Sequence, residues 1–69
     1  MIVRVARLPR PNVEQEVAVH EGATVLDVLR AVGVPPDAVV VLRDERPVPV
    51  DERVAAEDRL RVLTVFSGG

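Results

Sequence analysis

The chain has 69 residues, with nine basic residues, all of them arginine, against 11 acidic ones and a formal net charge of −2. This length allows one domain with a small core, which disfavours a deep, walled active site. The slightly acidic charge and the single aromatic residue, Phe66, disfavour nucleic-acid binding, and the absence of cysteine excludes disulfides, thiol nucleophiles and cysteine-ligated metal sites.

The N-terminal third of the chain predicts a β-hairpin. Residues 2–8 and 13–19 alternate between apolar and polar side chains, the two-residue period of a strand. Two prolines lie between these segments and cannot donate to a ladder, so they predict a short turn. In the second segment, Val13, Val17 and Val19 are expected on one face.

Residues 24–33 predict the one main helix. Thr24 is expected as its N-cap, with Asp27 completing a short capping box, and Gly33 as its left-handed C-cap. Its apolar side chains follow the stripe of a helix that lies on a core: Val25, Val28, Leu29 and Val32. Because valine is a weak helix former, this helix depends on packing against a sheet. The Pro35-Pro36 pair is expected to prevent the helix from restarting.

The second half of the chain predicts three short strands. Residues 39–43 form a β-branched run, and residues 60–66 are the last, mostly apolar, strand. Two prolines limit residues 48–50 to an edge strand at best. Residues 51–57 are expected to form a loop or a single helical turn.

This order of elements predicts an α+β, β-grasp (ubiquitin-like) fold. We expect a mixed sheet of four to five strands, with the helix of about residues 24–33 packed on one face. Residues 1–66 would form a single domain and residues 67–69 a flexible C-terminal tail that ends in diglycine. A ferredoxin-like half is the alternative, but it needs a second helix, and residues 51–57 are too short for one.

Candidate catalytic groups are few. His20 is the one histidine and lies in an expected turn, without the nucleophile and orienting acid that catalysis needs. Three acidic pairs are each followed by arginine, and their spacing fits no EF-hand loop: Asp44-Glu45-Arg46, Asp51-Glu52-Arg53 and Glu57-Asp58-Arg59. They are either solvated loops or a surface of mixed charge that orients a protein partner. No catalytic residue and no metal site is therefore predicted.

The last strand also predicts a surface. If Leu60 and Val62 contact the helix, alternation places Leu63 and Val65 on the open face of the sheet. Two readings stay open here: an exposed apolar patch that binds a protein, or a loop of residues 44–57 that folds over it. The residues predicted to bind a partner are Arg61, Leu63, Val65, Phe66 and Ser67.

The sequence ends in Gly68-Gly69. A terminal carboxylate is an acyl group that a protein has without modification, and a partner could activate it with ATP. Glycine has no Cβ and passes through a narrow channel where other residues would clash. An acyl-adenylate formed there could react with a sulfur nucleophile, and all other machinery would belong to the partner.

These features resemble the ThiS/MoaD family of ubiquitin-like sulfur carriers, including its archaeal and bacterial small modifiers, over essentially the whole chain. The likeness rests on three segments: Thr24-Val25-Leu26-Asp27-Val28-Leu29, Asp58-Arg59-Leu60 and Val65-Phe66-Ser67-Gly68-Gly69. Many members have Gly-Asp before the last strand, where this chain has Glu57-Asp58, which leaves the geometry of that turn open.

The resemblance implies a carrier and not an enzyme. Gly69 would be adenylated by an E1-like enzyme that uses ATP, with Gly68 as its flexible partner. A sulfur donor such as a cysteine desulfurase or a rhodanese-type protein would then give the thiocarboxylate. The sulfur would go to the thiamin thiazole, molybdopterin or thiolated tRNA, or the chain would be joined to target lysines by isopeptide bonds. The alternative is a non-catalytic β-grasp module that binds proteins.

The expected setting is a cytoplasmic monomer with no intrinsic cofactor and no direct contact with nucleic acid or membrane. No apolar run approaches the roughly 18 residues of a membrane span. The first residues also lack the separate charged and apolar regions of a signal peptide.

Overall fold

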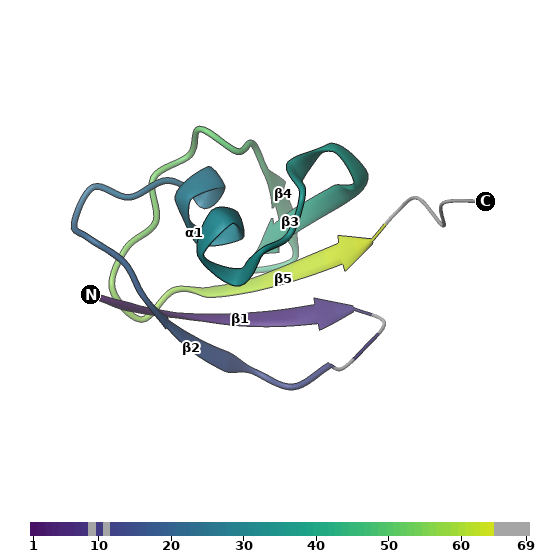
Figure 1. The fold of residues 1–69 in the computed structure, drawn as a ribbon, viewed down its shortest axis with the longest axis horizontal. Helices are drawn as coiled ribbons and strands as arrows, with labels where there is room; N and C mark the ends of the chain where they lie inside the picture. The colour runs from purple at the N-terminus through teal and green to yellow at the C-terminus, as the bar shows by residue number, and fades with distance from the viewer. Residues whose placement is uncertain (9, 11, 65–69) are drawn as a thin grey trace.

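A five-stranded sheet carries one α-helix on one face within residues 1–8, 10 and 12–64, which the computed structural model describes (Figure 1). The elements in chain order are β1 (Ile2–Leu8), β2 (Gln15–Ala18), α1 (Val25–Val32), the 3₁₀ turn η1 (Pro36–Ala38), β3 (Val39–Arg43), β4 (Arg46–Val48) and β5 (Arg59–Thr64). The predicted mixed sheet with one main helix is thus confirmed.

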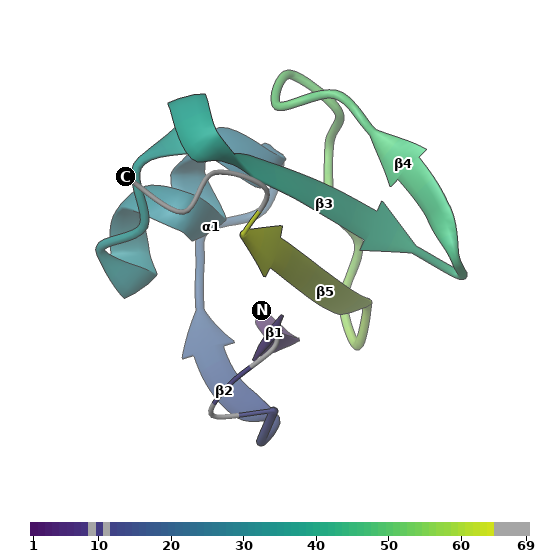
Figure 2. The ribbon, with the colours of Figure 1, turned by 90° about the vertical axis from the view of Figure 1, so that its right-hand side faces the viewer.

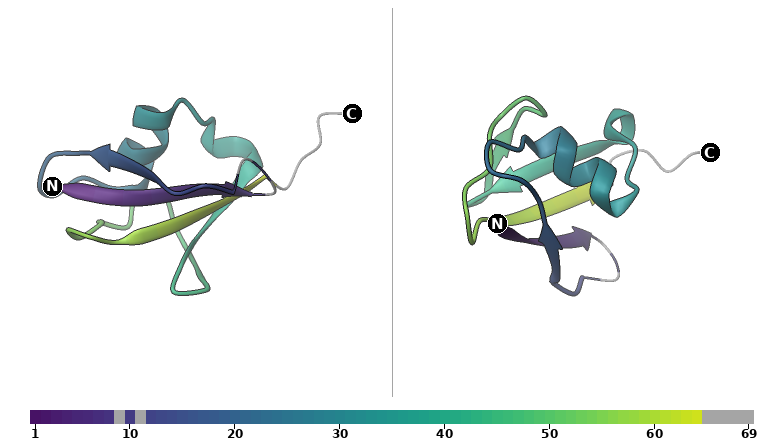
Figure 3. Two further views of the ribbon diagram at one scale, coloured as in Figure 1. Left: turned by 90° about the horizontal axis from the view of Figure 1, so that it is seen from below. Right: turned by 60° about the vertical axis from the view of Figure 1, so that its left-hand side comes forward.

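The strand order is β2-β1-β5-β3-β4, with β1 and β5 parallel and the other neighbours antiparallel. The parallel pair places Val5 beside Leu60, and the pair of β3 with β5 places Val41 beside Val62. These four side chains point to the same face and are almost fully buried. The helix α1 lies over one face of the sheet (Figure 3). Alternation then assigns their strand neighbours to the opposite, open face.

The core is built mainly from valine. β-branched side chains pack well on a pleated surface, and each fully buried one contributes roughly 1.5–3 kcal/mol relative to an exposed one. The helix adds three buried residues, which are three of the four predicted for its apolar stripe: Val25, Val28 and Leu29. Val54, from the long segment between β4 and β5, closes the same core.

Both ends of α1 follow the prediction. The Asp27 amide donates to Thr24 Oγ1 at 3.3 Å, and the Thr24 amide donates to Asp27 Oδ2 at 3.0 Å, so the capping box is reciprocal. Gly33 ends the helix at φ 74°, the left-handed conformation that glycine adopts without strain. In the described part of the chain, no helix is long and apolar enough to span a membrane.

Three boundaries differ from the prediction. β2 is shorter than residues 13–19, because its ladder with β1 ends at the pair of Val5 with Gln15, and Val13 is 65% exposed. β4 spans Arg46–Val48 rather than residues 48–50, and Pro47 is tolerated because β4 is an edge strand. Pro36 does not prevent a new turn. It starts η1, since the first position of a helix needs no N–H donor.

The segment between β4 and β5 runs along the start of α1 and not across the open face (Figure 1). The amides of Val25 and Leu26 donate to the carbonyls of Glu52 and Val50, both at 2.9 Å. The Val54 amide donates to the Ala23 carbonyl at 2.9 Å on the same side. Of the two readings left open for the open face, the structure therefore disfavours the one in which residues 44–57 fold over it, because residues 50–54 are hydrogen-bonded at the start of α1.

Candidate functional site

An apolar strip crosses the open face near the end of β5. Leu63 lies opposite Leu8 of β1 and Val40 of β3, and the three side chains share the face away from α1. Leu63 is 37% exposed, and the other two are half-buried. We call these three residues the apolar strip. It corresponds to one of the two readings that the alternation of the last strand left open, and Val65 of that reading lies outside the described residues.

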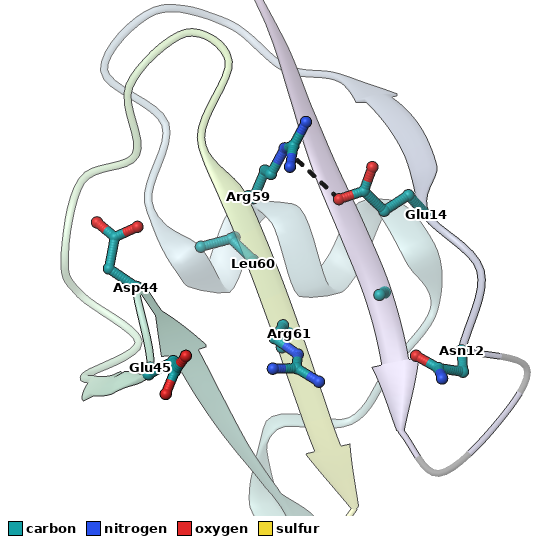
Figure 4. A pocket seen from close by; sticks show the side chains of 8 residues that line it. Asn12, Glu14, Asp44, Glu45, Arg59, Leu60 and Arg61 are labelled. Atoms are coloured by element: carbon teal, nitrogen blue, oxygen red, sulfur yellow. Dashed lines mark ion pairs between the residues drawn. The ribbon is translucent and has the colours of Figure 1, made fainter.

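Arg61 lies on the same face of the sheet, two residues before Leu63 on β5. Its neighbours across the sheet are Ala6 and Leu42, and its side chain is exposed. Figure 4 shows Arg61 in an open depression of about 330 Å³, with Glu45 on one side and Asn12 on the other. The strip therefore adjoins a rim of mixed charge, the arrangement that gives a protein interface its orientation.

At the end of this depression nearer the start of β5, Arg59 is already paired. Its Nε lies 3.6 Å from Glu14 Oε2, as the dashed line in Figure 4 marks. No ion pair between described residues involves Arg61. Of the two arginines that point onto the open face here, Arg61 is therefore the one without an ion pair among the described residues.

The structure brings together two of the predicted site residues, Arg61 and Leu63, in adjacent rows of one face. The others lie outside the described residues: Val65, Phe66, Ser67, Gly68 and Gly69. Sequence reasoning did not name Leu8 and Val40 as members of the strip. The sequence could have identified Leu8, because alternation along its strand places residue 8 on the face opposite Val3 and Val5.

The acidic pairs are not simply solvated loops. Arg43 Nη2 donates to Glu52 Oε2 at 2.8 Å, and its Nη1 lies 3.4 Å from Asp58 Oδ2 and 3.1 Å from the Arg53 carbonyl. The hydrogen bond to Glu52 and the nearby Asp58 charge raise the pKa of Arg43 above its already high value. The cation that holds Glu52 and Asp58 thus comes from β3, and the cation that holds Glu57 is Arg4 of β1. Three carboxylates of these pairs therefore have a structural role.

The turn before β5 resolves the departure from the family pattern. Glu57 adopts φ 68°, the left-handed conformation that glycine would adopt at the same place. Its amide donates to the Ile2 carbonyl at 2.8 Å, and its side chain accepts from Arg4. Glu57-Asp58 thus forms a turn in which glycine at position 57 would also fit without strain, and Asp58 Oδ2 accepts from the Ala55 amide at 2.7 Å.

His20 does not form a catalytic group. Its side chain is 71% exposed, and its Nε2 lies 3.6 Å from Asp27 Oδ2, which the capping box already uses. The hydrogen bond from the Thr24 amide holds the pKa of Asp27 below its usual value, so this carboxylate is a helix cap and a poor general base. Over the described ranges, no group of three or more His, Cys, Asp or Glu side chains is placed to hold a metal ion.

Comparison with known proteins supports a single family. The family described as small archaeal modifier protein 2 matches residues 1–66. A protein named small archaeal modifier protein 2 from Haloferax volcanii is 48% identical over 54 residues, which cover 78% of this chain and 80% of that protein. A protein named sulfur carrier protein TtuB from Thermus thermophilus is 37% identical over 65 residues, covering 94% and 95%.

The fold comparison agrees with the sequence comparison. The crystal structure of SAMP1 from Haloferax volcanii covers 100% of both chains with a TM-score of 0.78 at 26% identity. A solved ubiquitin from Caldiarchaeum subterraneum covers 100% of this chain with a TM-score of 0.74 at 23% identity, a likeness of fold alone. The predicted β-grasp, ubiquitin-like fold is thereby confirmed.

Proposed function

Because the chain belongs to the small archaeal modifier protein 2 family, we propose that the carboxylate of Gly69 is the group through which it acts. The chain is a ubiquitin-like modifier or sulfur carrier, a class that activating enzymes use as a substrate. Gly69 would become the acyl-adenylate and Gly68 would be the small residue behind it. Neither residue has a Cβ, so both fit a narrow channel in the activating enzyme.

The chemistry needs two steps. A carboxylate oxygen of Gly69 attacks the α-phosphorus of ATP, and pyrophosphate leaves with the electrons of the broken P–O bond. The terminal sulfur of a persulfide then attacks the acyl carbon and AMP leaves. A thiol reduces the remaining S–S bond and releases the thiocarboxylate. A lysine amine that attacks the same acyl carbon gives an isopeptide bond, AMP and a proton instead.

The observation that carries this proposal is the position of the apolar strip. Leu63 lies on the open face two residues from the start of the segment that leads to Gly68-Gly69, and no part of residues 44–58 covers it. An activating enzyme of the E1-like type would dock on the strip and on Arg61. The docked enzyme would also contact the C-terminal residues Val65, Phe66 and Ser67, which would lie at the entrance of its channel for Gly68-Gly69.

The remaining partners follow from the same chemistry. The sulfur donor would be a cysteine desulfurase or a rhodanese-type protein, because either supplies a persulfide. The acceptor would be an enzyme of tRNA thiolation, thiamin thiazole or molybdopterin synthesis, or lysines of target proteins. The chain would act in the cytoplasm as a monomer with no cofactor of its own, and ATP would be bound by the activating enzyme.

Intact mass spectrometry tests the proposal directly. The purified chain is incubated with the host's E1-like enzyme, ATP and a persulfide donor, and its mass is followed with time. We expect the adenylate and then the thiocarboxylate, both lost in a variant that lacks Gly69. If neither product forms while the same enzyme activates another carrier, the chain is a binding module and the proposal is wrong.

A further inference from the structure

A second concave surface lies at the same end of the molecule, on the helix side of the sheet. It has a volume of about 330 Å³. Figure 2 looks onto this end, where β1 and β5 stop and β3 begins. We call it the strand-end pocket. Its lining includes Arg7 of β1, Arg10 of the first hairpin turn, Val34 of the loop after α1, Val39 of β3, and Val62 and Thr64 of β5.

The pocket has an apolar floor and a cationic edge. Five of its lining residues are valine, proline or alanine, and its two charged residues are both arginine, in a chain with a net charge of −2. Asp37, in the adjacent η1 turn, is exposed and is not part of the lining. Cationic side chains beside apolar surface complement a ligand that is both acidic and aliphatic.

The two arginines are held differently. Arg7 Nη2 donates to the carbonyl of Val32 at the end of α1, where a cation also complements the helix dipole. Arg10 is exposed in the hairpin turn, which the hydrogen bond from the Asn12 amide to the Arg7 carbonyl closes at 2.9 Å. None of the ion pairs between described residues includes Arg10. Arg10 is thus the charge that a ligand can engage without breaking an existing contact.

We propose that the strand-end pocket receives a segment of the activating enzyme in which an acidic side chain adjoins an aliphatic one. The acid would pair with Arg10, and the aliphatic side chain would fill the floor between Val34 and Val39. A phosphate group fits less well, because it needs several converging hydrogen-bond donors. The guanidinium of Arg7 already donates to the Val32 carbonyl. This proposal rests on the proposed function, since it names a second contact of the same enzyme.

The two contacts lie on opposite faces of one strand end. Leu63 points to the open face, whereas Val62 and Thr64 line the pocket on the helix side. An enzyme that holds both surfaces encloses the end of β5 and restricts the direction in which the following residues leave. Contact with the strip alone would leave the chain free to tilt about it, so the pocket contact adds to the affinity of the enzyme for this chain.

Steady-state kinetics of ATP–pyrophosphate exchange tests the pocket. We expect Arg10→Glu to raise the KM of the activating enzyme for this chain by about tenfold, with kcat unchanged. The substitution removes one charge pair at the edge of the interface and places two like charges opposite each other. Arg10→Ala should raise it less and weaken its dependence on KCl. Arg46→Glu is the matched control, an exposed arginine on the edge strand β4, and should change KM less than about twofold.

Methyl NMR of the complex separates the alternatives. We expect the valine methyl signals of Val34 and Val39 to shift on addition of the enzyme, together with those of Leu63. Unchanged KM in Arg10→Glu, or enzyme-induced shifts at Leu63 alone, would overturn the proposal while wild-type exchange still supports the proposed function. A second control deletes residues 65–69 in the free chain. If this deletion shifts the Val34 and Val39 signals as much as the enzyme does, the pocket holds the chain's own C-terminal segment and the proposal is also overturned.

Discussion

Arg4 and Glu57 are 53 residues apart in the sequence, and Arg4 Nη1 donates to Glu57 Oε1 at 2.6 Å. Two backbone hydrogen bonds of 2.8 Å accompany this pair, from the Glu57 amide to the Ile2 carbonyl and from the Arg4 amide to the Asp58 carbonyl. The first strand therefore fixes the turn that starts the last one. These contacts hold Glu57 at φ 68°, a conformation that L-residues rarely adopt.

Replacing Glu57 separates backbone strain from the ion pair. Glu57→Ala and Glu57→Gly both lose the carboxylate, but only glycine adopts φ 68° without strain. We expect Glu57→Gly to be more stable than Glu57→Ala by about 1 kcal/mol, which for a domain of this size is about 4–8 °C in Tm. Glu57→Ala should be less stable than the wild type. Thermal and urea unfolding measure both differences, and equal stability of the two variants would contradict the strain.

The Asp27 cap predicts a pH dependence. Its pKa is lower in the folded state than in the unfolded chain, mainly because the Thr24 amide donates to the carboxylate. Its contribution to stability is therefore complete above the unfolded pKa of about 3.9 and is lost as the pH falls through the folded-state pKa. Urea unfolding at a series of pH values should show a smaller loss of stability on acidification for Asp27→Asn than for the wild type. Equal losses of stability on acidification in the two proteins would contradict this role of the Asp27 carboxylate.

Arg43 should stabilise the fold through the segment between β4 and β5. Arg43→Met keeps most of the aliphatic stem but removes the hydrogen bonds to Glu52, Asp58 and the Arg53 carbonyl, of which Asp58 keeps the one from the Ala55 amide. We expect a loss of about 1–2 kcal/mol, the lower part of the range for charged hydrogen bonds, because water screens a partly exposed group. Urea unfolding measures it. The control is Arg46→Met. Arg46 is exposed on the neighbouring strand β4, so this substitution should change the free energy of unfolding by less than about 0.5 kcal/mol.

The local parts of this fold could be predicted from the sequence, and the tertiary parts could not. Thr24, Asp27 and Gly33 lie within ten residues, so their pattern alone defines both ends of the helix. Val13 shows the limit, because alternation continues past the point where the ladder with β1 ends. The partners of Arg43 are nine and 15 residues away, and no periodicity relates them. At the site, the alternation of side chains along β5 predicted the face on which Leu63 lies. Its neighbours Leu8 and Val40 could be identified only once the order of the strands in the sheet was known.

Leu63 should matter for activation more than for folding. Leu63→Asn removes the most exposed member of the apolar strip, so we expect a change in unfolding free energy within about 1 kcal/mol. We expect the KM of the activating enzyme to rise by about tenfold, because a truncated hot-spot side chain commonly costs more than 1 kcal/mol. Val13→Asn is the control, since Val13 is 65% exposed and is not part of the strip. Equal KM values for the two variants would argue against docking on the open face.

The absence of lysine predicts how this chain takes part in conjugation. Its nine basic residues are all arginine, and a guanidinium stays protonated and is no acyl acceptor. Incubated with the E1-like enzyme and ATP, the wild type should therefore form no polymer linked through its own side chains. Arg46→Lys places one amine on the exposed edge strand and should permit such a link. Trypsin would cut after Arg61 and leave residues 62–69 on the acceptor lysine, which mass spectrometry detects. A side-chain-linked polymer of the wild type would contradict this prediction.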